Sequence, residues 1–187
     1  MKPWAVIAAS LLIRSVMTVS AESQPIAPPF GLSWVEKTSQ IAQVIEDSHL
    51  HLSQKESVEG REAWTVEGFD QPALSAAVFY FVGDDLDEVE LQYRDPKWSL
   101  AEFGNFMAQV KQSLDLKYGH PEVLAHSREP EKNITQTVVG YRWQQPGQCV
   151  DLVFFSAERE PLNFRLLSLH YKVQHQESAV RVASRND

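Results

Sequence analysis

The chain has 187 residues, 43% of them hydrophobic, and its 17 basic and 25 acidic side chains give a formal net charge of −8. This length and composition predict one globular domain with a packed core, or two very small ones. The negative charge disfavours nucleic acid and anionic lipid as partners. The single cysteine, Cys149, excludes an internal disulfide and is expected to pack as a small, half-buried hydrophobic residue.

Residues 1–21 have the pattern of a secretory signal. Lys2 precedes an apolar run, and the segment ends in small residues that predict cleavage after Ala21. Arg14 interrupts the run, so an N-terminal anchor and an unstructured start are the alternatives. A membrane-spanning helix is not expected, because about 20 apolar residues are needed and the run is shorter. Cleavage would leave 15 basic and 25 acidic residues, a net charge of 15 − 25 = −10.

The first half of the mature chain is predicted to contain a short helix and a β-meander. Prolines in 22–29 indicate an extended leader, and structure is expected from Phe30. Apolar residues at helical spacing predict a helix over 38–48, with a face made of Ile41, Val44 and Ile45. From Leu50 the apolar period changes to two. The expected strands cover about 50–52, 63–66, 75–82 and 86–94.

The second half repeats this order. A long helix is predicted from Pro96 or Ser99 to about Tyr118, with Gly119 at its end. Its apolar stripe consists of Leu100, Phe103, Phe106, Met107, Val110 and Leu114. The expected strands cover about 122–126, 137–143, 149–156 and 162–172, with a charged loop over 127–133. The polar tail over 174–187 is expected to be disordered.

Two hairpins, over 77–94 and 151–172, share one signature. Each has an aromatic-rich run, a charged turn and a second strand that ends in apolar-x-Leu-x-Tyr before a basic residue. Their similarity suggests a tandem repeat with halves 30–95 and 96–173, and the alternative is that any two amphipathic hairpins look alike. The equivalent pairs would be Tyr93 with Tyr171, 78 residues apart (171 − 93), and Phe79 with Phe154, 75 apart (154 − 79).

The predicted fold class is therefore α+β. About six to eight antiparallel strands, arranged as meanders, are expected to pack against two helices in one domain over 30–173. Four tryptophans lie in the mature chain near element ends, where a ring either fills the core or stands on a sheet face. If they lie on an exposed face, the candidate binding residues are Trp64, Tyr141 and Trp143.

The six histidines are candidates for catalysis or metal binding. His49 and His51 would share one face of a strand, with Asp47 as a third ligand, but ordinary polar positions explain them more simply. We expect His120 in a turn and His126 on an edge strand. We expect His170 on the polar side of the last strand and His175 in the tail. None has the spaced carboxylate and nucleophile of a triad.

Other site patterns are missing as well. The acidic residues over 84–90 lack the central glycine and closing glutamate of a calcium loop, and a solvated hairpin turn explains them better. The sequence has no phosphate-binding glycine loop, nucleophile elbow, CxxC pair or HExxH helix. We therefore expect no catalytic residue, no cofactor and no metal.

Three short motifs carry a resemblance that covers residues 30–172. They are Phe30-Gly31-Leu32-Ser33-Trp34, Tyr118-Gly119-His120-Pro121 and Tyr141-Arg142-Trp143. In this layout the chain resembles uncharacterised exported bacterial proteins, and it is similar to the tandem α/β units of β-lactamase inhibitor proteins and small outer-membrane assembly lipoproteins. It departs from them in having no lipobox cysteine and no paired cysteines. The resemblance implies a non-catalytic module whose sheet binds another protein.

The function predicted from sequence is an exported, non-catalytic protein-binding module of the bacterial periplasm. Its partner is another protein of unknown identity, with no nucleic acid and no stable membrane insertion. The first alternative is a small-molecule or lipid-binding protein, in which the sheet and the helix over 100–114 enclose an apolar cavity. The second is a hydrolase or metal enzyme, which requires two of His49, His51 and His126 to meet a carboxylate.

Overall fold

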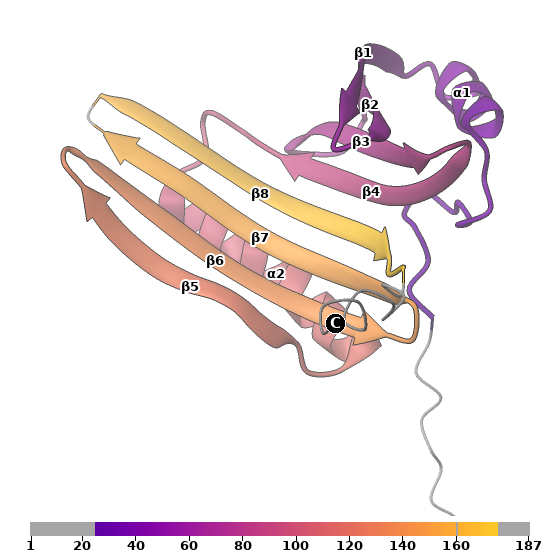
Figure 1. The fold of residues 1–187 in the computed structure, drawn as a ribbon. Coiled ribbons are helices and arrows are strands. Elements are labelled where there is room, and N and C mark those ends of the chain that lie inside the picture. Colours follow the sequence, from indigo (N-terminus) through magenta and orange to yellow (C-terminus); the bar gives the residue numbers. More distant parts are fainter. Residues whose placement is uncertain (1–24, 160, 176–187) are drawn as a thin grey trace, which may run out of the picture.

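The fold is seen in a computed structural model that describes residues 25–159 and 161–175. The elements run as one helix, four strands, one helix and four strands (Figure 1). The helices are α1 (Thr38–Asp47) and α2 (Leu100–Tyr118). The strands are β1 (His51–Val58), β2 (Arg61–Glu67), β3 (Leu74–Val82), β4 (Asp85–Tyr93), β5 (Glu122–Glu131), β6 (Ile134–Gln145), β7 (Gln148–Arg159) and β8 (Leu162–Val173). The predicted signal over 1–21 and nearly all of the predicted tail lie outside the described residues.

The eight strands form one antiparallel sheet in the order β1-β2-β3-β4-β8-β7-β6-β5. Each half of the chain contributes a four-stranded meander, and the two meanders join where β4 pairs with β8 (Figure 1). The predicted α+β class with antiparallel strands is thereby confirmed. No helix in residues 25–159 and 161–175 is long and apolar enough to cross a membrane.

Both helices pack against the same face of the sheet. Residues directly opposite each other in antiparallel strands share a face, so the register identifies its members. One row crosses β2, β3, β4, β8, β7 and β6 on this face, and it consists of Trp64, Phe79, Val89, Tyr171, Val150 and Trp143. From α2, the ring of Phe103 lies 5.8 Å from that of Phe154. From α1, Ile41 and Ile45 join the same buried cluster, so both halves share one core.

The long helix α2 begins and ends as its sequence predicts. The Ser99 hydroxyl accepts a hydrogen bond from the Glu102 amide, and the Glu102 carboxylate accepts one from the Ser99 amide. Gly119 follows the last turn with φ at +86°, a conformation that glycine adopts without steric cost. Of the predicted apolar stripe, Phe103 and Leu114 are fully buried, whereas Leu100 is largely exposed. The short helix α1 begins at Thr38, with Lys37 as its N-terminal capping residue.

The predicted charged loop over 127–133 is wrong. The edge strand β5 continues to Glu131 and pairs with β6 as far as the Glu131 and Ile134 positions. Its charged side chains gave the segment the composition of a loop. Edge strands, however, are often charged because charge prevents pairing with other chains, so composition alone did not distinguish the two.

Candidate binding surface on the open face of the sheet

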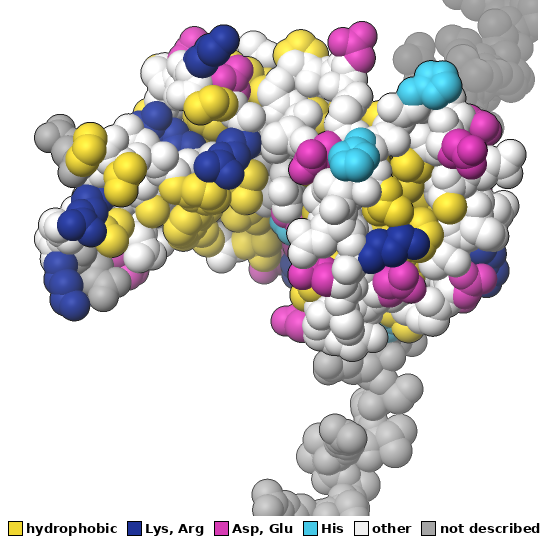
Figure 2. Space-filling view, turned by 90° about the horizontal axis from the view of Figure 1, so that it is seen from above, with side chains coloured by type: hydrophobic (Ala, Val, Ile, Leu, Met, Phe, Trp, Pro, Cys, Tyr) yellow, Lys and Arg dark blue, Asp and Glu magenta, His cyan; other side chains and the backbone are white. Residues whose placement is uncertain are grey.

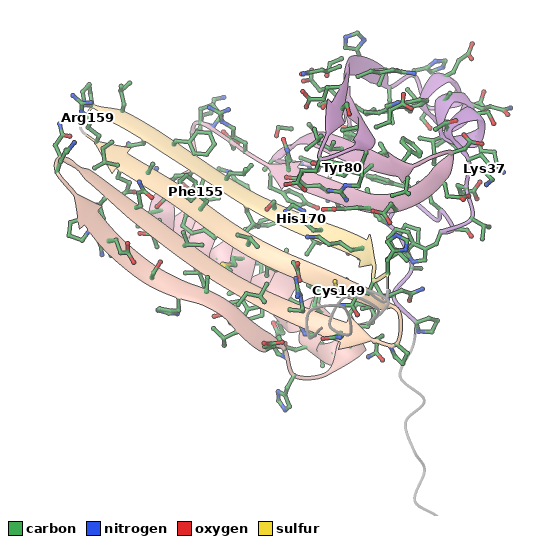
Figure 3. The ribbon with its side chains drawn as sticks, in the orientation of Figure 1. Lys37, Tyr80, Cys149, Phe155, Arg159 and His170 are labelled. Carbon is green, nitrogen blue, oxygen red and sulfur yellow. The ribbon has the colours of Figure 1, made fainter. Side chains whose placement is uncertain are left out.

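Within residues 25–159 and 161–175, no helix covers one face of the sheet, and we call this face the open face. In Figure 3, Phe155, Cys149 and His170 lie on the side of the sheet toward the viewer, with α2 behind the sheet. The open face has two regions. A network of charged and polar side chains lies over the join between β4 and β8, and apolar side chains lie over the far ends of β7 and β8.

The charged network follows directly from the strand register. Opposite positions on β4, β8, β7 and β6 hold Glu90, His170, Asp151 and Arg142. Acidic and basic groups therefore alternate across adjacent strands, where cross-strand neighbours of opposite charge attract. The neighbouring row adds Glu88 opposite Lys172.

Glu88 lies at the centre of this network. Its carboxylate accepts a hydrogen bond from Arg61 Nη1 at 2.7 Å and lies 2.8 Å from His170 Nδ1, with Lys172 Nζ at 3.7 Å. Burial alone would raise the pKa of Glu88, but the hydrogen bonds from His170 and Arg61 and the charge of Lys172 outweigh it and lower the pKa to about 2. Glu88 is therefore ionised at neutral pH and joins three strands.

Asp151 forms the second centre. Arg142 binds it through two parallel hydrogen bonds, 2.6 Å from Nε and 2.7 Å from Nη2, and Lys172 Nζ lies 3.3 Å away. The Asp151 side chain is only 5% exposed, so this bidentate pair is nearly shielded from water on its acidic side. The hydrogen bonds to Asp151 raise the pKa of Arg142 further above its already high value.

Tyr80 completes the network on the β3 side. Its hydroxyl donates a hydrogen bond of 3.0 Å to Glu90, and the Arg61 guanidinium lies 4.5 Å from the centre of its ring. Burial and the Glu90 charge raise the pKa of Tyr80, so the phenol stays protonated and remains a donor. Figure 3 shows Tyr80 and His170 on neighbouring parts of the open face.

The sequence prediction for the acidic residues over 84–90 is correct only in part. Asp84 and Asp85 are exposed in the hairpin turn, as expected. Asp87, Glu88 and Glu90 are buried, so a solvated turn is wrong for these three. Their basic partners come from β2 and β8, far away in sequence. The sequence did contain a signal that these acidic residues belong to a strand, because acidic positions alternate with Val89 and Leu91 in β4. In β8, His170 and Lys172 alternate with apolar residues in the same way.

Within the network, Ser168, His170 and Glu88 follow the order of a nucleophile, a base and an orienting acid. His170 Nε2 lies 2.9 Å from Ser168 Oγ, and its Nδ1 faces Glu88. Ser168 is buried, and β8 is paired on both sides at this position, with β4 and with β7. Its neighbouring backbone amides are thus used in the sheet and do not form an oxyanion hole. The geometry fits a hydrogen-bonded structural link.

The apolar patch, our name for Val138, Val153, Phe155, Leu162, Phe164 and Leu166, covers the other end of the open face. Its members come from β6, β7 and β8, and Phe155 lies opposite both Val138 and Leu166. The rings of Phe155 and Phe164 lie 5.9 Å apart, and the Arg94 guanidinium lies 4.9 Å from the centre of the Phe164 ring. Leu162 is 71% exposed and Phe164 is 37% exposed. Figure 2 shows hydrophobic side chains with basic ones beside them toward the left of the molecule, and more acidic side chains toward the right.

The three aromatic residues predicted as binding candidates lie on the opposite face. Trp64 and Trp143 are 4% and 1% exposed in the core beneath the helices. Tyr141 is half-buried there, with the Lys111 ammonium 5.1 Å from its ring centre. Arg142, which lies between Tyr141 and Trp143 in sequence, faces the open side and binds Asp151. The alternation of Arg142 with Tyr141 and Trp143 was the signal that these rings face the core.

The histidines named for an enzyme do not converge. His49 lies in the turn before β1 and His51 is the first residue of β1, whereas His126 lies on β5. The strands β1 and β5 form opposite edges of the sheet. Residues 25–159 and 161–175 contain no group of three or more His, Cys, Asp or Glu side chains that could hold a metal ion. Cys149 is buried, and burial raises its pKa, so the thiol stays protonated.

Comparison with known proteins adds no relative to these observations. No protein-family model, curated protein or solved structure matches the chain.

Proposed function

We propose that the chain is a non-catalytic module of the bacterial periplasm that binds another protein through the open face of its sheet. The observation that carries this proposal is the apolar patch on a face that neither α1 nor α2 covers. An antiparallel sheet can leave one face to water, but that face is then normally polar. Contiguous apolar side chains on an exposed surface are typical of sites that bind a partner.

The charged network supports the same proposal. Its carboxylates and bases are already paired with one another, so a partner would meet groups held in place rather than mobile side chains. Fixed charges beside an apolar centre resemble the usual division of an interface into a hydrophobic core and a polar rim. The partner expected from this arrangement is a folded protein that presents an apolar segment flanked by charged groups. Within the patch, Phe155 and Phe164 are the anchors, because buried aromatic residues dominate binding energies.

Export remains part of the proposal because of the pattern over 1–21. The mature chain would begin at Glu22 and remain in the periplasm. Cell fractionation followed by N-terminal sequencing of the mature protein tests this step. A cytoplasmic protein that retains Met1 would contradict it.

We also infer that the sheet consists of two copies of a helix-and-four-strand unit. Leu91 lies opposite Leu169, and the two are 169 − 91 = 78 residues apart, the same offset as Tyr93 and Tyr171. A local twofold axis between Leu91 and Leu169 would produce this register. An experimental structure in which the two halves cannot be superposed by such a rotation would contradict the duplication.

Site-specific photocrosslinking tests the binding surface directly. A photoreactive phenylalanine analogue replaces Phe155 or Phe164, and a control protein carries it at Leu116, which is 84% exposed on α2. After irradiation in living cells, the open-face positions are expected to give one discrete protein adduct that the control does not give. The same adduct from all three positions, or from none, would contradict the proposal.

The order Ser168, His170 and Glu88 is the one observation that favours a second candidate, a hydrolase. A fluorophosphonate probe tests it, since such probes label only activated serines. Our proposal predicts no labelling of Ser168. Labelling that is lost in Ser168→Ala and in His170→Gln would establish the hydrolase instead.

A further inference from the structure

A separate apolar pocket lies between α1 and the helix-covered face of the sheet. It has a volume of about 300 Å³, at the lower end of the range of small-molecule sites. Its floor is made by Phe79 of β3 and by Ile41 and Ile45 of α1, all of them buried. Its mouth is bordered by Phe30, Val44 and Phe69, and Phe30 is 44% exposed. This pocket lies on the other side of the sheet from the apolar patch.

An unfavourable backbone conformation holds Phe30 at the mouth of this pocket. Phe30 and Gly31 have φ angles of +64° and +72°, and the Leu32 amide donates to the Pro29 carbonyl at 3.3 Å. Two central residues with positive φ are the arrangement of a type I′ turn, in which asparagine followed by glycine is strongly preferred. A bulky residue with positive φ is a genuine outlier. The backbone conformation of the turn therefore disfavours Phe30, and the contacts of its side chain must account for its presence.

This backbone conformation places the Phe30 ring against two other aromatic rings. The ring stacks on Phe69 with ring centres 5.2 Å apart and an interplanar angle of 11°, and it lies 6.3 Å from Phe79. Three aromatic rings from the turn, the β2 to β3 connection and β3 thus form one wall of the pocket. Backbone strain at functional sites is retained where the side chain's position is needed.

The polar groups of the pocket indicate which ligand would fit. Among the described residues, the lining includes one acidic residue, the exposed Asp70, and one residue with a hydroxyl, Ser48, but no Lys, Arg or His. A carboxylate at this position repels an anionic ligand, and no basic residue in the described part of the lining offsets that repulsion. The geometry points to a binding site for a small aromatic molecule that is neutral or cationic, held by Phe30, Phe69 and Phe79. This site is independent of the proposed protein-binding surface.

A pair of fluorescent probes tests the site in the full chain. N-phenyl-1-naphthylamine is neutral, and 8-anilino-1-naphthalenesulfonate has the same aromatic skeleton with a sulfonate. The wild-type protein is expected to bind the neutral probe at least tenfold more tightly than the sulfonate. Asp70→Asn is expected to reduce the difference in affinity between the neutral probe and the sulfonate.

Phe30→Asn is the decisive variant. Asparagine is favoured in this turn, so the melting temperature is expected to stay the same or rise while affinity for the neutral probe falls at least tenfold. Val44→Glu, at an exposed position of α1, should weaken binding similarly without touching the turn, and Leu116→Asn on α2 is the matched control. The inference would be overturned if the wild type did not bind the neutral probe, or if Phe30→Asn and Val44→Glu both bound it as tightly as the wild type. Loss of binding in Phe164→Asn instead would place the probe on the open face and also overturn it.

Discussion

The imidazole of His170 in β8 lies 2.8 Å from the carboxylate of Glu88 in β4, measured from Nδ1 to Oε1. This contact crosses the join between the two halves of the sheet. The same carboxylate is bound by Arg61 from β2, so one side chain connects three strands. The link is polar and buried, and its contribution to stability must therefore depend on the ionisation of Glu88.

Glu88→Gln tests this dependence. The pKa of Glu88 falls from 4.5 to about 2 on folding, so the ionised group stabilises the folded state above about pH 4.5, and this contribution is lost as the pH falls through about 2. At about 1.4 kcal/mol per pH unit, (4.5 − 2) corresponds to about 3 kcal/mol as an upper bound. Urea unfolding at pH 7, 4 and 3 should show that the difference in unfolding free energy between the wild type and Glu88→Gln becomes smaller as the pH falls.

Glu46→Gln, at an exposed position of α1, is the control for this series and should follow the wild type at every pH. A difference between wild type and Glu88→Gln that stays constant from pH 7 to pH 3 would show that the Glu88 charge does not stabilise the fold.

The Arg142 and Asp151 pair predicts non-additive substitutions. Arg142→Leu removes the bidentate partner of the buried Asp151 charge and leaves Lys172 Nζ at 3.3 Å, and the loss of a partner from such a pair costs about 3 kcal/mol. The double variant Arg142→Leu with Asp151→Leu removes both charges and should be more stable than Arg142→Leu alone. A double-mutant cycle of unfolding free energies measures the coupling. If the double variant lost as much unfolding free energy as the two single variants together, the two groups would not interact.

The N-terminus of α2 depends on Ser99. Its hydroxyl is bonded to the Glu102 amide, so Ser99→Ala leaves that amide without a capping partner and should cost about 1 kcal/mol in unfolding free energy. Ser113→Ala is the matched control, because Ser113 lies exposed inside the same helix and bonds only the Gln109 carbonyl. That substitution should be neutral or slightly stabilising, since alanine has the higher helix propensity. Equal losses in the two variants would refute the cap.

The elements of the fold could be predicted from sequence because their signals are local. Helical spacing of apolar residues indicated α1 and α2, and Gly119 marked the end of α2. A continuous apolar run indicated β3, and alternation indicated β4. The edge strand β5 was predicted too short because its charged residues resemble a loop. How the two meanders join was not predictable, since the pairing of Leu91 with Leu169 depends on contacts between distant parts of the chain.

The candidate site was harder to predict for the same reason. Glu88 and Glu90 have acidic neighbours in sequence, but their basic partners are Arg61, His170 and Lys172, brought close only by the sheet. In the same way, the apolar patch combines residues from three strands. The aromatic candidates Trp64 and Trp143 were chosen by residue type, whereas the face on which each ring lies is decided by strand register.

Trp143 provides the clearest distinction between a core role and a binding role. Its indole nitrogen donates to the Gly119 carbonyl at 3.0 Å and to the Asp115 carboxylate at 3.2 Å, which ties the end of α2 to β6. Trp143→Phe keeps an aromatic ring but removes this donor, and it should lower the unfolding free energy by about 2 kcal/mol. Leu116→Ala, on the exposed side of α2, is the control and should change it by less than about 0.5 kcal/mol. In the folded variant, photocrosslinking from Phe164 should be unchanged, because Trp143 lies on the other face of the sheet. If the Trp143→Phe protein had wild-type stability but no longer gave the adduct, Trp143 would belong to the binding surface.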